Sequence, residues 1–183
     1  SYYMGITLDP DSLLDESGIT GGESNNTIAV PVEVVSSAPV YDLTIGSVSD
    51  VLIMDSAGSI LPSTGPVLSP DMTSFGVSMS ISNLGGSPAD IYKVKVALYS
   101  DSALTTVVSG SELTVSGNTI YASATNQFNV SGIPMPVGIA DGTYYIGITL
   151  DVDNELDETL VTGGEDNNTI ALPITIESPK PDI

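Results

Sequence analysis

The sequence contains one segment twice, and this duplication constrains the fold more than any other feature. Residues 1–36 and 143–178 align without gaps at an offset of 142, with about 22 identical positions. The last three residues, 181–183, also resemble residues 41–43, which follow the first copy. We therefore expect a stretch of a tandem array with a period of about 140 residues, which begins late in one repeat and stops as another starts. A lone domain with a duplicated β-hairpin is the alternative.

Apolar and polar residues alternate in both copies, which is the pattern of β-strands with one buried face. In the second copy the predicted inward set is Tyr144, Ile146, Ile148, Leu150, Ile170, Leu172, Ile174 and Ile176. In the first copy the corresponding set is Tyr2, Met4, Ile6, Leu8, Ile28, Val30, Val32 and Val34. Pro31 and Pro173 fall on the outward side. Because proline has no N–H to donate to a neighbouring strand, both predict an edge strand.

Further strands are predicted between the two copies. Inward side chains are expected at Phe75, Val77, Met79, Ile81, Tyr92, Val94, Val96 and Leu98. Other strands are expected over 40–48, 104–108, 112–115 and 119–130, and the proline-containing stretch 55–72 is expected to be a surface excursion on one edge. Seven or eight short strands joined by Gly, Pro, Ser and Asn turns predict an all-β fold, a two-sheet β-sandwich.

This pattern predicts three parts. Residues 1–36 form a C-terminal β-hairpin that belongs to a preceding or swapped repeat. Residues 37–178 form a complete sandwich, and residues 179–183 are a linker or the start of the next repeat.

The charge composition excludes several functions. The chain has 23 Asp and Glu against 3 Lys and Arg, no His, Cys or Trp, and a net charge of −20. Such a surface repels phosphates, so nucleic acid is excluded as a partner. Without His and Cys there is no Ser–His or Cys–His nucleophile pair, zinc finger or disulfide, and we expect no enzyme activity. No apolar run approaches the roughly 20 residues of a membrane helix.

Three segments resemble one known family. They are residues 41–49 (YDLTIGSVS), residues 74–101 (SFGVSMSISNLGGSPADIYKVKVALYSD), and the acidic hairpin from residue 141 (DGTYYIGITLDVDNELDE, then EDNNTI). In combination they resemble the CARDB domain, the cell-adhesion-related domain found in bacteria. The resemblance covers residues 40–177, with 1–36 as a partial copy. It implies an immunoglobulin-like β-sandwich arranged in tandem on large prokaryotic surface or secreted proteins. The four residues that end at Tyr144 also resemble a tyrosine corner.

About half of the acidic residues lie in the turn of this hairpin and of its first copy. Two explanations offset the repulsion of crowded carboxylates: a hard cation with six to eight oxygen ligands, or solvation combined with capped turns. The predicted calcium ligands are Asp151, Asp153, Asp157, Glu158 and Asn168, and the corresponding first-copy set is Asp9, Asp11, Asp15, Glu16 and Asn26. Leu13 and Ser24 replace two acids of the second copy, so the first copy is expected to bind more weakly.

These features favour a non-enzymatic structural repeat of a prokaryotic cell-surface or extracellular protein, which builds a rod or filament, supports adhesion and is rigidified by calcium. The alternative is a carbohydrate- or ligand-binding module, for which Tyr3, Tyr99 and Tyr145 are the outward aromatic candidates. Sequons at Asn25, Asn129 and Asn167 are candidate sugar attachment sites.

The leading copy also needs a partner. Two amphipathic strands are not stable alone in water. Either upstream sequence covers their apolar face, or another molecule does so by strand addition or swapping. We therefore expect self-association into a fibre or tandem array, with a surface glycan or protein as a further ligand.

Overall fold

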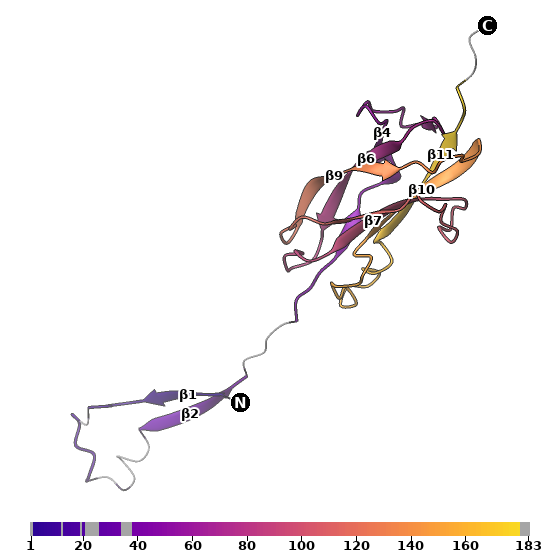
Figure 1. Cartoon of the computed structure of the whole chain (residues 1–183). Helices are drawn as coiled ribbons and strands as arrows, with labels where there is room; N and C mark the ends of the chain where they lie inside the picture. Colours follow the sequence, from indigo (N-terminus) through magenta and orange to yellow (C-terminus); the bar gives the residue numbers. More distant parts are fainter. Residues whose placement is uncertain (1, 12, 19, 21–25, 34–37, 180–183) are drawn as a thin grey trace. The chain divides into compact units, whose positions relative to one another are not determined.

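The computed structural model describes residues 2–11, 13–18, 20, 26–33 and 38–179 (Figure 1). The chain divides into two compact units, Ser1–Ala38 and Pro39–Ile183. The first unit holds the leading hairpin, made of β1 (Tyr2–Thr7) and β2 (Thr27–Val32). Across the described residues, no helix has the length and apolar character needed to span a membrane.

The leading hairpin is antiparallel and amphipathic. Tyr2, Met4 and Ile6 of β1 lie opposite Val32, Val30 and Ile28 of β2, so the apolar side chains share one face, as the alternation predicted. This face is open to solvent, because Met4 is 52% exposed and Ile28 is 59% exposed. Val34, which was predicted to extend the face, lies outside the described residues.

The second unit consists of two sheets. Its elements are β3 (Leu43–Ile45), the short 3₁₀ helix η1 (Val48–Asp50), β4 (Leu52–Met54), β5 (Val67–Leu68), β6 (Ser74–Asn83), β7 (Lys93–Tyr99), β8 (Leu113–Ser116), β9 (Ala124–Pro134), β10 (Gly142–Leu150) and β11 (Thr169–Ile176). One sheet has the order β5–β11–β10–β7–β8. In the other, β9 pairs with β6 along its length, while β3 and β4 pair with different parts of β6. We call β10 and β11 the closing hairpin.

This arrangement is an immunoglobulin-like sandwich, as predicted. The closing hairpin, β7 and β8 follow the G-F-C-C′ order of one immunoglobulin sheet, and β3, β6 and β9 follow the A-B-E order of the other. The hydroxyl of Tyr144, near the start of β10, donates a hydrogen bond of 3.2 Å to the carbonyl of Ala140. This is the bond of a tyrosine corner.

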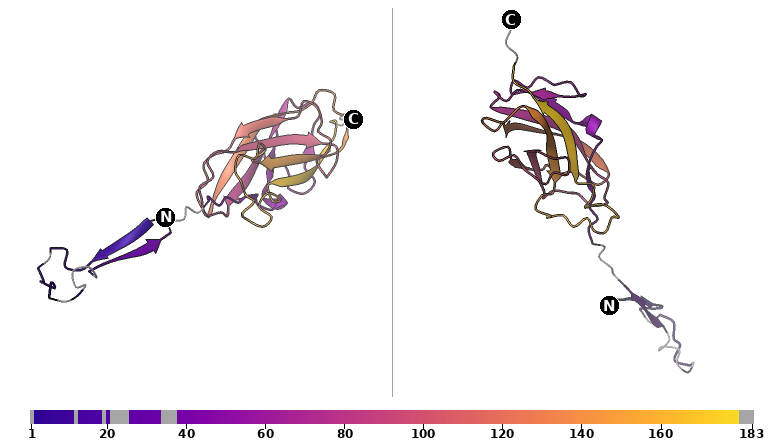
Figure 2. Two further views of the ribbon diagram at one scale, coloured as in Figure 1. Left: turned by 90° about the horizontal axis from the view of Figure 1, so that it is seen from below. Right: turned by 90° about the vertical axis from the view of Figure 1, so that its right-hand side faces the viewer.

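The core lies between the two sheets (Figure 2). The predicted inward residues of β6 and β7 are all buried: Phe75, Val77, Met79, Ile81, Val94, Val96 and Leu98 are at most 1% exposed. The same sheet as β7 also contributes Ile146, Ile148 and Leu150 of β10, which are at most 1% exposed. The period-two pattern therefore identified these core residues correctly, because alternate side chains of a strand share one face and this face meets the facing sheet.

A motif in the β6–β7 connection is explained by a buried asparagine. The side-chain amide of Asn83 donates to the carbonyls of Ser87 and Ile120 at 2.8 and 3.0 Å, and its oxygen accepts the N–H of Gly85 at 3.0 Å. A Cβ on Gly85 would lie 2.4 Å from the carbonyl oxygen of Val40. Asparagine and glycine are thus required here for satisfied hydrogen bonds and for close backbone approach.

Three strand predictions need correction. The strand predicted over 40–48 is only Leu43–Ile45, because η1 follows at Val48, with Asp50 accepting the N–H of Ser47 at 3.0 Å. The strand predicted over 104–108 is a turn with one bridge, from Val107 to Tyr99. The last is shifted, since β9 covers Ala124–Pro134 rather than 119–130.

The stretch 55–72 returns to the sandwich and contributes β5. Thr175 and Glu177 of the closing hairpin region donate backbone hydrogen bonds to Pro66 and Leu68, so β5 extends the sheet beside β11. The predicted edge is therefore only partly correct: β11 lies between β10 and β5, but Pro173 falls outside the two residues that pair with β5. The proline therefore leaves part of this edge without a donor.

Candidate functional site

The loop between β10 and β11, residues 151–168, holds the predicted second-copy ligands, and Asp151 organises its first turn. This residue has a φ of 45° and is 5% exposed. Its two carboxylate oxygens accept the backbone N–H groups of Glu155 and Leu156 at 3.1 and 2.8 Å. Leu156 is thereby folded inward to 3% exposure. Asp151 therefore caps a turn and anchors an apolar side chain in the core.

Glu158 joins the loop to the first strand of the sandwich. Its side chain is fully buried. One oxygen accepts the backbone N–H of Leu43 at 2.5 Å, and the other accepts the side-chain amide of Asn168 at 2.5 Å. Burial raises the pKa of the Glu158 carboxyl above its ordinary value of 4.5, and these two hydrogen bonds act against that rise. This buried carboxylate links Glu158 to Leu43, which is 115 residues earlier in the chain, and thereby holds the loop against β3.

Three further polar residues surround Glu158, and none of them was among the predicted calcium ligands. The Glu165 carboxylate accepts the backbone N–H of Glu158 at 2.8 Å. The side-chain amide of Asn167 donates to Asp42, which is itself buried, at 2.9 Å. For Asp42, the sequence did contain a signal: the Asp-Leu pair at 42–43 recurs in similar form, as Asp-Ile, at 182–183. We call Asp42, Glu158, Glu165, Asn167 and Asn168 the Glu158 cluster.

The other two predicted ligands of this loop point elsewhere. Asp153 forms an ion pair with Lys93 of β7. The Asp157 carboxylate accepts hydrogen bonds from the Thr159 hydroxyl at 2.5 Å and from the Thr159 backbone N–H at 3.1 Å, and both bonds lower the pKa of Asp157. Of the five predicted ligands, only Glu158 and Asn168 are therefore in direct contact. Within the part of the chain that the structure covers, no three acidic, His or Cys side chains are grouped to hold a metal ion.

The first copy reproduces the turn without the core. Asp9 has a φ of 43°, and its carboxylate accepts the N–H groups of Leu13 and Leu14 at 2.8 Å each. Asp15 accepts the N–H of Ser17 at 3.0 Å, as Asp157 does in the second copy. Leu14, however, is 66% exposed. Asp11 is exposed, whereas Glu16 and Asn26 are half-buried.

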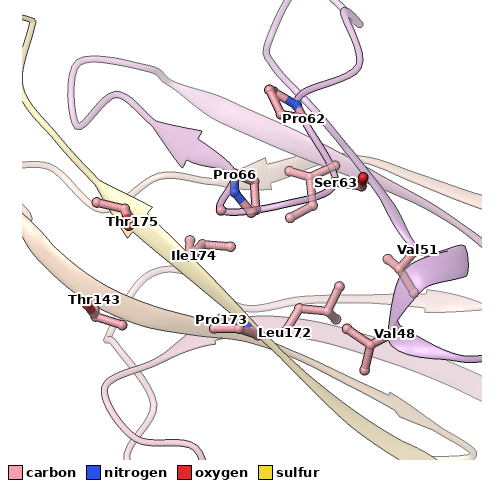
Figure 3. Close-up of a pocket in the computed structure, with 12 residues that line it drawn as sticks. Val48, Val51, Pro62, Ser63, Pro66, Thr143, Leu172, Pro173, Ile174 and Thr175 are labelled. Atoms are coloured by element: carbon pink, nitrogen blue, oxygen red, sulfur yellow. The ribbon is translucent and has the colours of Figure 1, made fainter.

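An apolar cavity lies at the edge of the sandwich (Figure 3). It has a volume of about 190 Å³ and lies between β11, the η1–β4 segment and the loop before β5. Leu172, Ile174, Val51 and the two prolines 62 and 66 give it an aliphatic lining, with hydroxyls at Ser63, Thr143 and Thr175. None of its lining residues is ionisable. The cavity can hold a small apolar group, but its lining offers no general acid or base.

The aromatic and sequon predictions have mixed outcomes. Tyr99 was expected to face outward and is instead 7% exposed. It is held close to Gly147, where a Cβ would come within 2.5 Å of its ring. Tyr145 is half-buried and Tyr3 is 68% exposed, so of these three predicted candidates Tyr3 is the exposed one. Asn129 is exposed on β9, and Asn25 lies outside the described residues.

Comparison with solved structures finds two similar structures of one CARDB domain. The crystal structure of a CARDB domain from Pyrococcus furiosus, solved in complex with di-metal ions, covers 79% of this chain and 100% of that domain, at 19% identity and a TM-score of 0.47. A solution structure of the same domain covers 76% of this chain and 97% of that one, at 21% identity and a TM-score of 0.45. No protein-family model and no curated protein matches the chain.

Proposed function

We propose that this protein is a non-enzymatic structural repeat of a prokaryotic cell-surface or extracellular protein, which builds a rod and supports adhesion. The observation that carries this proposal is the duplication itself: the leading hairpin in residues 1–36 repeats the closing hairpin. The leading hairpin has the same sequence pattern as a hairpin that supplies two strands of the sandwich. A chain that carries such units one after another has a natural way of making a long, stiff structure from a single fold.

The path of the chain through the second unit supports a rod. Residues 42 and 43 are held beside the start of β11 by Glu158 and Asn167. The strand then runs eight residues away from this point before the chain leaves the sandwich at Ile176 (Figure 1). At about 3.3 Å per residue, the chain enters and leaves the sandwich some 26 Å apart. Repeats linked in this manner extend along one axis.

The structural repeat can be tested by adding, in front of the leading hairpin, the sandwich strands that it lacks. Residues 37–142 are joined in front of residue 1 of the full chain, so that the leading hairpin gains a sandwich to close. Stretched between its ends, the extended chain should unfold in two events of similar size, each releasing about 140 residues, or roughly 480 Å of contour length. The original chain should show one such event. A single event in the extended chain would refute the repeat.

Calcium is the second part of the proposal. We infer that Ca²⁺ binds the acidic loop 151–168, close to where the chain enters the sandwich, and stiffens this junction. Two observations support it: the loop concentrates carboxylates, and the side-chain oxygens of Asn167 and Asn168 in the Glu158 cluster are buried without a hydrogen-bond partner. Ca²⁺ takes carboxylate and amide oxygens of this kind.

The calcium proposal predicts a selective gain in stability. Micromolar to millimolar Ca²⁺ should raise the melting temperature, and equal Mg²⁺ should raise it much less. The Asp157→Asn variant, which loses a predicted ligand, should lose the Ca²⁺-dependent part of this rise. Asp71→Asn removes the same charge at an exposed position outside the loop and should keep it. An equal response to both metals would leave turn capping and solvation as the role of these acids.

A ligand-binding module is the second candidate, and the cavity of Figure 3 is the observation that favours it. Its aliphatic lining suits a short apolar side chain or acyl group better than a sugar ring, which binds on aromatic platforms. A glycan array tests the carbohydrate form of this candidate. Binding of a sugar that the Tyr3→Ala variant loses would support it over the structural repeat.

A further inference from the structure

We propose that the apolar face of the leading hairpin is a docking surface for a second copy of this chain. The face consists of Tyr2, Met4, Ile6, Ile28, Val30 and Val32. The face binds residues 39–142 of another molecule of this chain when the closing hairpin of that molecule is released. The inference rests on the proposed structural repeat and names the partner that the uncovered hairpin takes.

The leading hairpin already has the conformation of the closing hairpin. Gly5 lies opposite Ala29 in the first, and Gly147 lies opposite Ala171 in the second, so the two registers are the same at the offset of 142. The first hydrogen bond of the turn also agrees. It runs from the Leu8 N–H to the Asn26 carbonyl at 2.7 Å, and from the Leu150 N–H to the Asn168 carbonyl at 2.8 Å. The leading hairpin needs little rearrangement in order to dock.

The closing hairpin shows what covers such a face. In β10, Ile146 lies opposite Leu98 of β7 and Ile148 lies opposite Val96, and both isoleucines are 0% exposed. The corresponding Met4 and Ile6 are 52% and 46% exposed. Apolar residues at the same spacing therefore have different surroundings: β7 and the facing sheet cover the closing hairpin, and among the described residues no such strands cover the leading hairpin. The occupant that matches this face is another set of the same strands.

A glycine also supports this occupant. Gly147 is required in the closing hairpin, because a Cβ there would lie 2.5 Å from the ring of Tyr99 on β7. Gly5 stands at the corresponding position of the leading hairpin, yet a Cβ there would meet nothing within 4 Å. Glycine weakens a strand interior unless another group approaches closely. Gly5 thus leaves the space that the Tyr99 ring of a second copy would fill.

The length of the linker favours a second copy over the same chain. If the leading hairpin replaced the closing hairpin in its own sandwich, residue 34 would occupy the place of Ile176. The chain would then have to return along the length of β11, about 26 Å, to reach Leu43. The nine steps from 34 to 43 span at most about 30 Å when fully extended. Docking within one chain therefore needs an almost fully stretched linker, and docking between chains does not.

The accepting copy must have lost its closing hairpin, because one set of strands holds one hairpin. If the leading hairpin of one intact copy displaced the closing hairpin of another, one apolar face would be covered and another uncovered. The exchange buries no additional apolar surface, so intact copies gain nothing from it. A copy whose own hairpin cannot close does gain, and because donor and acceptor surfaces differ, the association continues head to tail.

The test uses full-length variants in which the closing hairpin is disabled. Ile148→Asp with Leu172→Asp places two carboxylates in the core, since these residues are 0% and 4% exposed. The matched variant adds Gly5→Val, which has open space in the leading hairpin but would clash with Tyr99 after docking. Mass is followed by light scattering over a hundredfold range of concentration, and β-structure by circular dichroism.

The I148D/L172D variant should keep its β-structure and at least double its mean mass as its concentration rises. The wild type and the G5V/I148D/L172D variant should keep the monomer mass throughout. Monomer mass for I148D/L172D at every concentration, whether folded or unfolded, overturns the docking proposal. So does equal association of the triple variant, because that indicates unspecific aggregation. The stretching result for the extended chain is independent of both outcomes, so the structural repeat can stand when docking between copies fails.

Discussion

Matched substitutions at Ile148 and Ile6 test whether the two hairpins differ in burial as described. The two residues correspond at the offset of 142, and each is the third inward residue of its strand. Ile148 is 0% exposed and packs in the core beside Val96, whereas Ile6 is 46% exposed. Alanine at either position removes the same atoms from the same local structure. Any difference in the free energy of unfolding therefore reports the tertiary environment alone.

The expected magnitude follows from the atoms that alanine removes. Ile→Ala deletes three carbon groups, which at about 0.8 kcal/mol each gives about 2.4 kcal/mol of lost transfer free energy. The cavity left in a packed core adds to this, so Ile148→Ala should cost about 3–4 kcal/mol. Ile6→Ala leaves no cavity and lies in the other compact unit. Its effect on unfolding of the sandwich should be within about 0.5 kcal/mol.

Urea unfolding at pH 7, followed by circular dichroism and tyrosine fluorescence, measures both values. With a slope of about 2 kcal/mol per molar urea, the Ile148→Ala midpoint should fall by roughly 1.5–2 M, and the Ile6→Ala midpoint should stay near that of the wild type. Similar losses for the two variants would refute the reasoning, because the leading hairpin would then be as well covered as the closing one. A loss below about 1 kcal/mol for Ile148→Ala would show that this position is not in a packed core.

Three further predictions concern single polar groups. Because the folded state raises the pKa of Glu158 above 4.5, it binds more protons than the unfolded state above that pH. Stability should therefore fall as the pH rises from 4.5 through the raised pKa of Glu158. The Glu158→Gln variant should show a smaller fall in the urea midpoint between pH 4 and 7. Burial raises the pKa of Tyr92, whose hydroxyl donates to the Asn118 carbonyl, to about 12. Ultraviolet titration should show that Tyr92 ionises late, and stability should be lost as pH rises from 10 toward 12. Tyr144→Phe removes the bond to Ala140 and should cost about 1 kcal/mol, seen as a melting temperature lower by about 3–6 °C, whereas an unchanged value would count against a structural tyrosine corner.

The strands that bury one face were predictable, and the reasons for the failures are specific. Strand β6 and the closing hairpin alternate strictly, so their inward residues could be assigned from the sequence. The segment 40–48 contains the same residue types, but Asp50 caps a 3₁₀ turn at Ser47 and ends the strand early. Tyr99 was placed outward by the alternation. Its ring lies over Gly147 of the neighbouring strand, the diagonal neighbour of Tyr99 in the register, where no side chain blocks it. The alternation of one strand does not contain this cross-strand relation.

The acidic loop shows a similar division. The sequence predicted Asp151 and Glu158 as ligands of one site. Both side chains are buried, and both oxygens of each carboxylate accept a hydrogen bond. Their roles differ from the predicted common ligand set, because one caps backbone within the loop and the other reaches Leu43 in a distant strand. Crowded carboxylates along a chain do not specify whether they converge, since each can turn toward a different donor. Asp153 turned toward Lys93, the nearest cation on β7.

The sequence by itself determined the local conformation of both hairpins. The same alternation and the same Asp-capped turn give the same register and the same first turn bond in each copy, whatever surrounds them. Only the tertiary structure decided which copy has a core. Burial depends on strands that lie far away in the chain, and β7, β6 and β3 are present for one hairpin and not for the other. Identical isoleucines at positions 6 and 148 therefore end up exposed and buried, because a hairpin encodes its own shape but not the partner that covers it.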